Sequence, residues 1–125
     1  NGTREELAII RLTEDGQLDT GFSSDGKFTL AMGGSEMAND SLLNDFSGKI
    51  TVVGRARDGH LGFAVARLNE NGTLDTSFNS TGYVYTPIGD NTAIARSIER
   101  LPSGKLLVGG YAWMFGRYNF ATARY

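Results

Sequence analysis

The chain has 125 residues, a formal net charge of −2 and no cysteine. This length suits one domain with a sizeable core. The near balance of acidic and basic residues argues against a nucleic-acid partner, and the lack of cysteine excludes disulfides and thiolate metal sites. No apolar run approaches the roughly 18 residues of a membrane-spanning helix, so we expect no membrane insertion.

Short runs of alternating apolar and polar residues follow one another along the chain, separated by turns that contain glycine. This alternation is typical of strands with one buried face, and no window of eleven or more residues has a helical pattern. We therefore predict an all-β protein. The predicted strands, in chain order, are Leu7–Leu12, Lys27–Met32, Asp40–Phe46, Lys49–Ala56, Gly62–Leu68, Tyr83–Ile88, Ile94–Leu101, Lys105–Ala112 and Asn119–Tyr125.

Two kinds of connection join these strands. Ser47-Gly48 and Ser103-Gly104 are predicted to be tight hairpin turns, in which glycine takes a positive φ at no steric cost. Asp15-Gly16 and Asn71-Gly72 open longer connections that run through a Leu-Asp-Thr segment.

The sequence repeats itself after 56 positions. Residues 7–56 align without a gap to residues 63–112, and 19 of the 50 aligned pairs are identical. The register then slips by one residue, and residues 120–125 repeat residues 63–68. We treat residues 1–125 as a single repeat domain, with repeat one at 7–62, repeat two at 63–119 and the start of a third at 120–125.

Each unit holds four strands in an antiparallel order, which is what a β-propeller blade requires. The expected fold is therefore all-β, with propeller-type four-stranded antiparallel blades and about two repeats per chain. The nine strands would form one complete set of four, with two strands before it and three after it.

The segment Phe63–Phe78, then Gly82 and the turn Pro102-Ser103-Gly104-Lys105, resembles the bacterial delta-60 repeat. The resemblance covers nearly the whole chain from Leu7 onward. It implies β-propeller-like blades in a large secreted or surface-attached bacterial protein. It implies no enzymatic activity and carries no set of catalytic residues.

A blade buries each face against a neighbouring blade, so two blades alone leave two apolar faces in water. The chain is therefore expected to belong to a longer repeat array or to form a homo-oligomer. Three copies of a two-blade chain would close a six-bladed ring, which makes a trimer the favoured oligomer. The ninth strand does not fit that simple count.

Searches for catalytic and metal-binding patterns give little. His60 is the only histidine and lies in a polar turn. A zinc site needs several His or Cys ligands, and the aspartates form no dense alternating ladder that would favour calcium. We expect no cofactor, no metal and no enzymatic function.

Arg11, Arg67 and Arg124 occupy the same place in successive copies, and Asp19 and Asp75 follow the first two arginines by eight residues. An arginine among large apolar residues needs a partner or access to water. We predict charge-assisted hydrogen bonds from Arg11 and Arg67 to the Leu-Asp-Thr turns. The alternative is a ring of arginines that binds a ligand.

The two copies differ most after the Val-Gly strand. Residues 55–62 are predicted to be a polar loop, whereas residues 111–119 are predicted to be a loop rich in aromatics. The aromatic loop has three interpretations: packing within its own blade, an interface with another chain, or a platform for a sugar or other ligand. The candidate residues for binding or interface are Tyr111, Trp113, Phe115, Arg117, Tyr118, Arg55, Arg57 and His60.

Taken together, the sequence favours a non-enzymatic binding or adhesion module of a secreted or cell-surface bacterial protein. A rigid β scaffold would present loops, and recognition of a glycan or another cell-surface ligand would reside in those loops. The alternative is a structural spacer whose repeats only build length or assembly.

Overall fold

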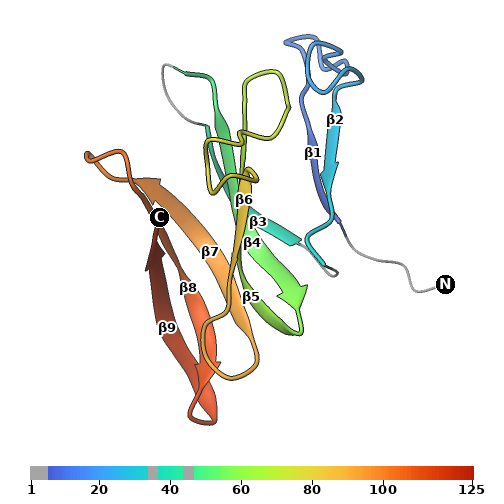
Figure 1. The fold of residues 1–125 in the computed structure, drawn as a ribbon. Coiled ribbons are helices and arrows are strands. Elements are labelled where there is room, and N and C mark those ends of the chain that lie inside the picture. Colours follow the sequence, from blue (N-terminus) through green and yellow to red (C-terminus); the bar gives the residue numbers. More distant parts are fainter. Residues whose placement is uncertain (1–5, 34–36, 44–46) are drawn as a thin grey trace, which may run out of the picture.

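The computed structural model describes residues 6–33, 37–43 and 47–125, and the strands of this part are all antiparallel (Figure 1). The all-β prediction is confirmed. No helix of the described part is long and apolar enough to cross a membrane. The strands are β1 Leu7–Ile10, β2 Lys27–Leu30, β3 Met37–Leu43, β4 Ile50–Asp58, β5 His60–Leu68, β6 Tyr83–Thr86, β7 Ala93–Arg100, β8 Leu106–Met114 and β9 Arg117–Arg124.

The strands form three sheets that follow one another along the chain. Sheet 1 contains β1 and β2, sheet 2 has the order β3-β4-β5-β6, and sheet 3 has the order β7-β8-β9. In Figure 1 they lie side by side from the blue strands through green to red. The predicted grouping of two, four and three strands is therefore confirmed. Sheet 2 is the complete blade, and it combines strands from repeat one with strands from repeat two.

Sheets 2 and 3 pack face to face and form the main core. Phe63, Val65 and Val53 come from sheet 2, and each is at most 1 % exposed. They meet a surface of sheet 3 built from small residues. The small side chains leave room for the large Phe63 ring, so the two faces pack closely. The buried residues of that surface are Ala93, Ala95, Val108, Ala112 and Ala121.

Sheets 1 and 2 pack through a smaller cluster on the other face of sheet 2. Leu7 of β1 is buried against Val52 and Ala66 of sheet 2, with Ile9 and Leu30 beside it. Both faces of the four-stranded sheet are therefore covered by a neighbouring sheet. The repeat thus builds a stack in which each sheet buries one face of the next.

Both copies have a β-bulge in the first strand of the blade, at Asn39 in β3 and at Arg96 in β7. These equivalent residues lie 57 positions apart, whereas the sequence alignment uses 56. The connection before this strand is one residue longer in the second copy and the connection after it is one residue shorter, since Leu43 pairs with Ile50 but Arg100 pairs with Leu106. The gap-free alignment of the sequence is therefore wrong by one residue in this strand.

The predicted glycine turns have the expected backbone. Gly48 and Gly104 have φ values of 64° and 83°, in the left-handed region that favours glycine. In the second copy, Leu101 and Lys105 close the turn by a backbone hydrogen bond of 2.8 Å. Residues 44–46 of the first turn lie outside the described residues.

The two predicted loops at residues 55–62 and 111–119 are wrong, because most of these residues lie in strands. β4 and β5 continue to the turn at Gly59, and β8 and β9 continue to the two-residue turn at Phe115-Gly116. The outer ends of these hairpins carry charged or aromatic side chains on exposed positions. The alternation of apolar and polar residues, from which strands are predicted, is absent there because neither face of the hairpin end is fully buried.

We predict that Phe63→Ala lowers the free energy of unfolding by about 3–5 kcal/mol, because it opens a cavity between sheets 2 and 3. Phe120 holds the equivalent position in β9 but is 81 % exposed. Phe120→Ala is the matched control and should change stability by less than about 0.5 kcal/mol. Urea unfolding of the two variants at low protein concentration measures both values, and equal losses would contradict the packing described.

Candidate functional site

An aromatic cluster covers the outer face of sheet 3, the face turned away from sheet 2. Trp113 pairs with Tyr118 across the β8–β9 hairpin, and Tyr111 pairs with Phe120. Residues two apart in a strand point to the same side. The four rings therefore share one face, and Phe115 lies in the turn between the two strands. We call these five residues the aromatic hairpin: Tyr111, Trp113, Phe115, Tyr118 and Phe120.

The rings contact one another at their edges. The Tyr118 ring lies 4.9 Å from the Trp113 ring and 5.2 Å from the Tyr111 ring, and both pairs are T-shaped. This geometry is the favourable one for aromatic pairs. It holds Tyr118 between two neighbours although its own side chain is exposed.

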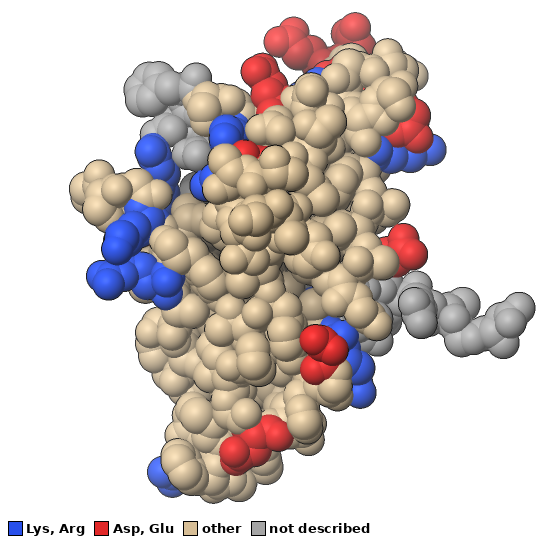
Figure 2. All heavy atoms as spheres, viewed as in Figure 1, with Lys and Arg blue, Asp and Glu red and all other residues tan. Residues whose placement is uncertain are grey.

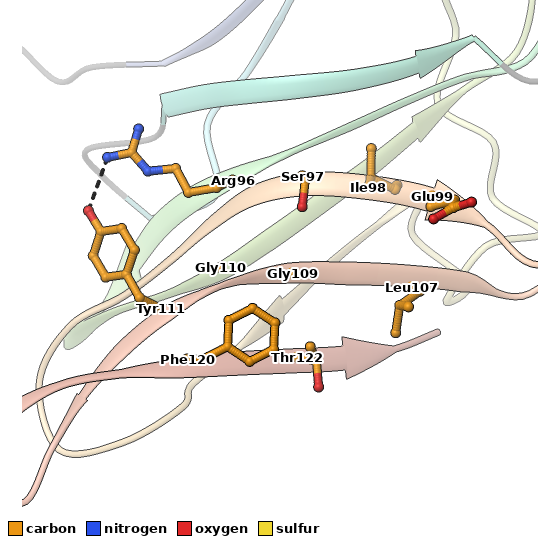
Figure 3. Close-up of a pocket in the computed structure, with 10 residues that line it drawn as sticks. All are labelled: Arg96, Ser97, Ile98, Glu99, Leu107, Gly109, Gly110, Tyr111, Phe120 and Thr122. Atoms are coloured by element: carbon orange, nitrogen blue, oxygen red, sulfur yellow. Dashed lines mark hydrogen bonds between the residues drawn. The ribbon is translucent and has the colours of Figure 1, made fainter.

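Arg96 joins this cluster because it is the bulged residue of β7. A bulge re-aims a side chain, and the Arg96 guanidinium donates a hydrogen bond of 3.0 Å to the Tyr111 hydroxyl. It also lies over the Tyr111 ring, 5.4 Å from the centroid. Figure 3 shows this pair at one end of the face. The sequence analysis missed Arg96 because the bulge has no sequence signal.

An open hollow of about 450 Å³ lies beside the cluster on the same face. Figure 3 shows Phe120, Thr122 and Leu107 side by side on β8 and β9 along it. Its surface is mostly apolar and open to solvent. In Figure 2 the charged side chains lie around the rim of the visible face of the molecule, and uncharged residues cover its middle.

The tip of the aromatic hairpin is a strained turn. Phe115 and Gly116 form a two-residue loop with φ values of 56° and 74°, as in a type I′ turn. Asparagine or aspartate is preferred at the first of these positions, whereas a bulky residue in this region is strained. Phe115 is nevertheless 86 % exposed. The backbone strain at Phe115 and the exposure of its ring both disfavour the folded state, which indicates that Phe115 has a role other than stabilising the fold.

The first copy places Arg55, Arg57 and His60 on the β4–β5 hairpin. Arg57 and His60 are exposed, and Arg55 is half-buried. The hairpin end is tied to β6, because the Tyr85 hydroxyl donates a hydrogen bond of 2.9 Å to the backbone carbonyl of His60. These residues belong to sheet 2, so the candidates of the two copies lie on separate hairpins (Figure 1).

The repeated arginines and aspartates meet in the Leu-Asp-Thr turns. Arg11 Nε lies 2.8 Å from Asp19 Oδ2, and Arg67 Nε lies 2.7 Å from Asp75 Oδ2. Each guanidinium also lies over a phenylalanine ring of its turn, Phe22 or Phe78. Arg124 is exposed on β9. The first two arginines thus fix a turn to the strand before it.

Asp75 is the one charged residue that is buried among the described residues. It accepts hydrogen bonds from Lys49 at 2.6 Å, from Arg67, and from the Ser77 hydroxyl at 2.6 Å. Burial alone would raise the pKa of this carboxyl, but the hydrogen bonds from Lys49 and Ser77 and the charge of Arg67 hold it well below its usual range. Lys49 was missed by the sequence analysis, although its repetition as Lys105 was a usable signal.

These turns also connect one repeat to the next. Phe22 of the first turn is fully buried and packs on Gly72 of the second, where a Cβ atom would come within 2.9 Å of the ring. Ser23 N–H donates to the Asn71 carbonyl at 2.8 Å. Arg11 donates to the carbonyl of Glu70. The turns therefore form a second layer of contacts beside the stacked sheets.

The described part of the chain contains no group of three or more His, Cys, Asp or Glu residues arranged to hold a metal ion. The expectation that the protein has no metal or cofactor stays a prediction.

Comparison with known families supports the fold. Residues 1–22 and 47–78 match the model of a β-propeller domain of unknown function, DUF5122. The chain is therefore similar to a β-propeller-like repeat family, although the matched segments do not identify the delta-60 repeat in particular. No curated protein and no solved structure gives a significant match.

We predict that Asp75→Asn lowers the free energy of unfolding at pH 7 by about 2–4 kcal/mol, because Arg67 and Lys49 lose their counter-charge. Asp19→Asn is the matched control in the first copy. Its ion pair is more exposed and lacks the lysine, so its loss should cost about 0.5–1 kcal/mol.

The Asp75 contribution should also depend on pH. Because folding lowers the pKa of Asp75, its stabilisation is complete above the unfolded pKa of about 4 and is lost as the pH falls below that value. Urea unfolding from pH 7 to about pH 2 should show the wild type converging on Asp75→Asn. A difference that does not change with pH would contradict this assignment.

We further predict that Phe115→Asn raises the free energy of unfolding by about 0.5–1 kcal/mol, because asparagine suits the left-handed position of a type I′ turn. Thermal unfolding measures the change, and Arg117→Asn, just outside the turn, is the control that should give no gain. A loss of stability in Phe115→Asn would show that the Phe115 ring has a structural contact in the folded chain.

Proposed function

We propose that the chain is a non-enzymatic binding module of a secreted or surface-attached bacterial protein, and that the aromatic hairpin holds its ligand site. The observation that carries the proposal is the exposed Phe115 at a strained turn, on the hairpin that also carries the half-buried Trp113 and the exposed Tyr118. Neither the strain nor the exposed aromatic surface stabilises the isolated fold. Exposed apolar surface of this kind marks interaction sites.

The position of the hairpin supports this role. In the first copy, residues 57–60 of the β4–β5 hairpin remain exposed although sheet 3 covers the face of sheet 2. The tip of the β8–β9 hairpin is the equivalent element. It would therefore stay accessible even if a further sheet packed on sheet 3. Figure 1 shows both hairpin tips at the lower end of the view and the Leu-Asp-Thr turns at the upper end.

A carbohydrate is the ligand class that fits best. Sugar rings present C–H faces that pack on aromatic rings, whose faces are negative, while sugar hydroxyls need polar partners at the edge. The hairpin offers both, since Arg96 lies over Tyr111 and the Arg117 side chain is exposed beside the turn. A bacterial adhesion role follows from this ligand class together with the resemblance to secreted and surface repeats.

The non-enzymatic part of the proposal has its own support. The single histidine, His60, is exposed on the β4–β5 hairpin, and the buried carboxylate of Asp75 is engaged by Lys49 and Arg67. A carboxylate whose pKa is held low by two cations is a poor general acid or base at neutral pH. The ion pairs of Asp75 with Lys49 and Arg67 therefore explain its burial without a catalytic role.

Binding to a glycan array and to whole bacterial and host cells tests the proposal. We expect the wild type to bind a restricted set of glycans, and Trp113→Ala and Phe115→Asn to weaken binding by about 30-fold or more, as for an interface hot spot. Phe115→Asn is the sharper variant, because it is expected to preserve or increase stability. Its binding loss could then not be attributed to unfolding.

Arg57→Ala and His60→Ala are the matched controls on the first hairpin and should leave binding unchanged. If they weaken binding while the aromatic variants do not, the ligand site lies on the β4–β5 hairpin and its assignment to the aromatic hairpin is wrong. If the wild type binds no glycan and no cell, the binding function is wrong, and the alternative of a structural spacer is favoured.

A further inference from the structure

The two Leu-Asp-Thr turns differ at one position beside their ion pairs. In the second copy the Ser77 hydroxyl donates to Asp75 Oδ1 at 2.6 Å and accepts a hydrogen bond of 3.3 Å from Arg67 Nη2. Because a hydroxyl group can donate and accept at once, it bridges the carboxylate and the guanidinium. The equivalent residue of the first copy is Gly21, which has no side chain to form this bridge.

The place of that hydroxyl is open in the first copy. Arg11 donates through Nε to Asp19 Oδ2 and through Nη1 to the Glu70 carbonyl. A Cβ atom on Gly21 would lie 3.7 Å from Arg11 Nη2 and 3.1 Å from Asp19 Oδ1. The Arg11 and Asp19 side chains are 30 % and 32 % exposed, so a molecule from solvent can reach them. One small polar group at this place would contact both ends of the missing bridge.

An open hollow of about 490 Å³ lies at this place. Arg11 and Gly21 line it from the first turn, Ser47 and Lys49 from the segment before β4, and residues 69–71 from the second turn. The hollow is therefore formed within the chain, where sheet 1 meets sheet 2. Figure 1 shows these turns at the upper end of the sheets, far from the tip of the β8–β9 hairpin.

The lining of the hollow combines hydrogen-bond donors with acceptors. Arg11 and Lys49 are cationic, Glu70 is anionic, and the Asn71 amide is neutral. An anion would be repelled by the Glu70 carboxylate and a cation by Arg11 and Lys49, so the lining favours a neutral ligand. The Ser77 hydroxyl of the second copy shows which neutral group fits between the arginine and the aspartate of such a turn.

We propose that this hollow binds a small neutral polyol or one hydroxyl-rich sugar unit. One ligand hydroxyl accepts a hydrogen bond from Arg11 Nη2 and donates to Asp19 Oδ1, as the Ser77 hydroxyl does in the second copy. The other hydroxyls contact Lys49 and Glu70. The residues that line the hollow are all glycine or polar, so hydrogen bonds carry the binding, and the Kd is on the order of 1–10 mM.

Titration of the wild type with glycerol, myo-inositol and glucose, followed by nitrogen–proton NMR spectra, tests the site. At least one polyol should give saturable shifts of the Gly21 and Asn71 amides and of Arg11 Nε–H. Binding at the aromatic hairpin would instead shift the Phe115 amide, so the two sites can succeed or fail separately. Maltotriose distinguishes the source of the ligand: tighter binding than glucose marks a sugar chain, and equal binding marks a free polyol.

Gly21→Ser is the decisive variant, because it supplies the hydroxyl that the second copy already has. It should weaken polyol binding about 10-fold or more and should leave the thermal unfolding temperature unchanged or raise it. Gly21→Ala, whose methyl group occupies the same place, replaces it if the serine variant does not fold.

Glu70→Gln tests the charge of the ligand. The amide still accepts hydrogen bonds, so the variant should bind a neutral polyol within about threefold of the wild type. Glu14→Gln is the matched control, since Glu14 is the equivalent exposed residue of the first copy. Sodium acetate and glycine are the anionic and zwitterionic probes, and neither should give saturable shifts at Gly21.

Three results would overturn the proposal. The first is a wild type in which no polyol shifts the Gly21, Asn71 and Arg11 groups. The second is a Gly21→Ser variant that binds polyols as tightly as the wild type. The third is tighter binding of acetate or glycine than of every polyol at these groups, which would show that the ligand is charged.

Discussion

Face-to-face packing of narrow sheets is the interaction on which the rest of this structure depends. A sheet of two to four strands cannot enclose a core by itself, so each sheet must cover an apolar face of its neighbour. Phe63 shows how this works, because a large ring from sheet 2 meets the small side chains of Ala93, Ala95 and Ala112 in sheet 3. The repeat places equivalent residues on every sheet, so the same packing rule sets the order of the sheets along the chain.

The packing also decides which residues are available for function. Strand residues in the middle of sheet 2 face a neighbouring sheet on either side, and the Leu-Asp-Thr turns are held by Arg11, Arg67 and the buried Asp75. The ends of the long hairpins project beyond these contacts. They can therefore vary without disturbing the stack, and they do vary: polar and cationic residues in the first copy are replaced by aromatic residues in the second.

Much of the fold follows from the sequence, because alternation and glycine turns are local signals. All nine strands were predicted, and Gly48 and Gly104 have the positive φ that their turns required. The ends of the hairpins were not predicted, since Arg57 and Trp113 lie on strands that lack a fully buried face there. The shift between β3 and β7 escaped notice because a longer connection before β7 and a shorter turn after it compensate in length. Arg96 joined the candidate site only through the bulge in β7, and Lys49 only through a contact between distant segments.

The most direct test of this account is a nuclear Overhauser experiment on methyl-labelled protein. Strong cross-peaks are expected between the ring protons of Phe63 and methyl groups of the alanine and valine residues on the inner face of sheet 3, among them Ala95 and Val108. No cross-peaks are expected from the Phe120 ring to those methyl groups, because that ring lies on the opposite face. A Phe63 ring without contacts to sheet 3, or a Phe120 ring in contact with its inner face, would contradict the stacked arrangement.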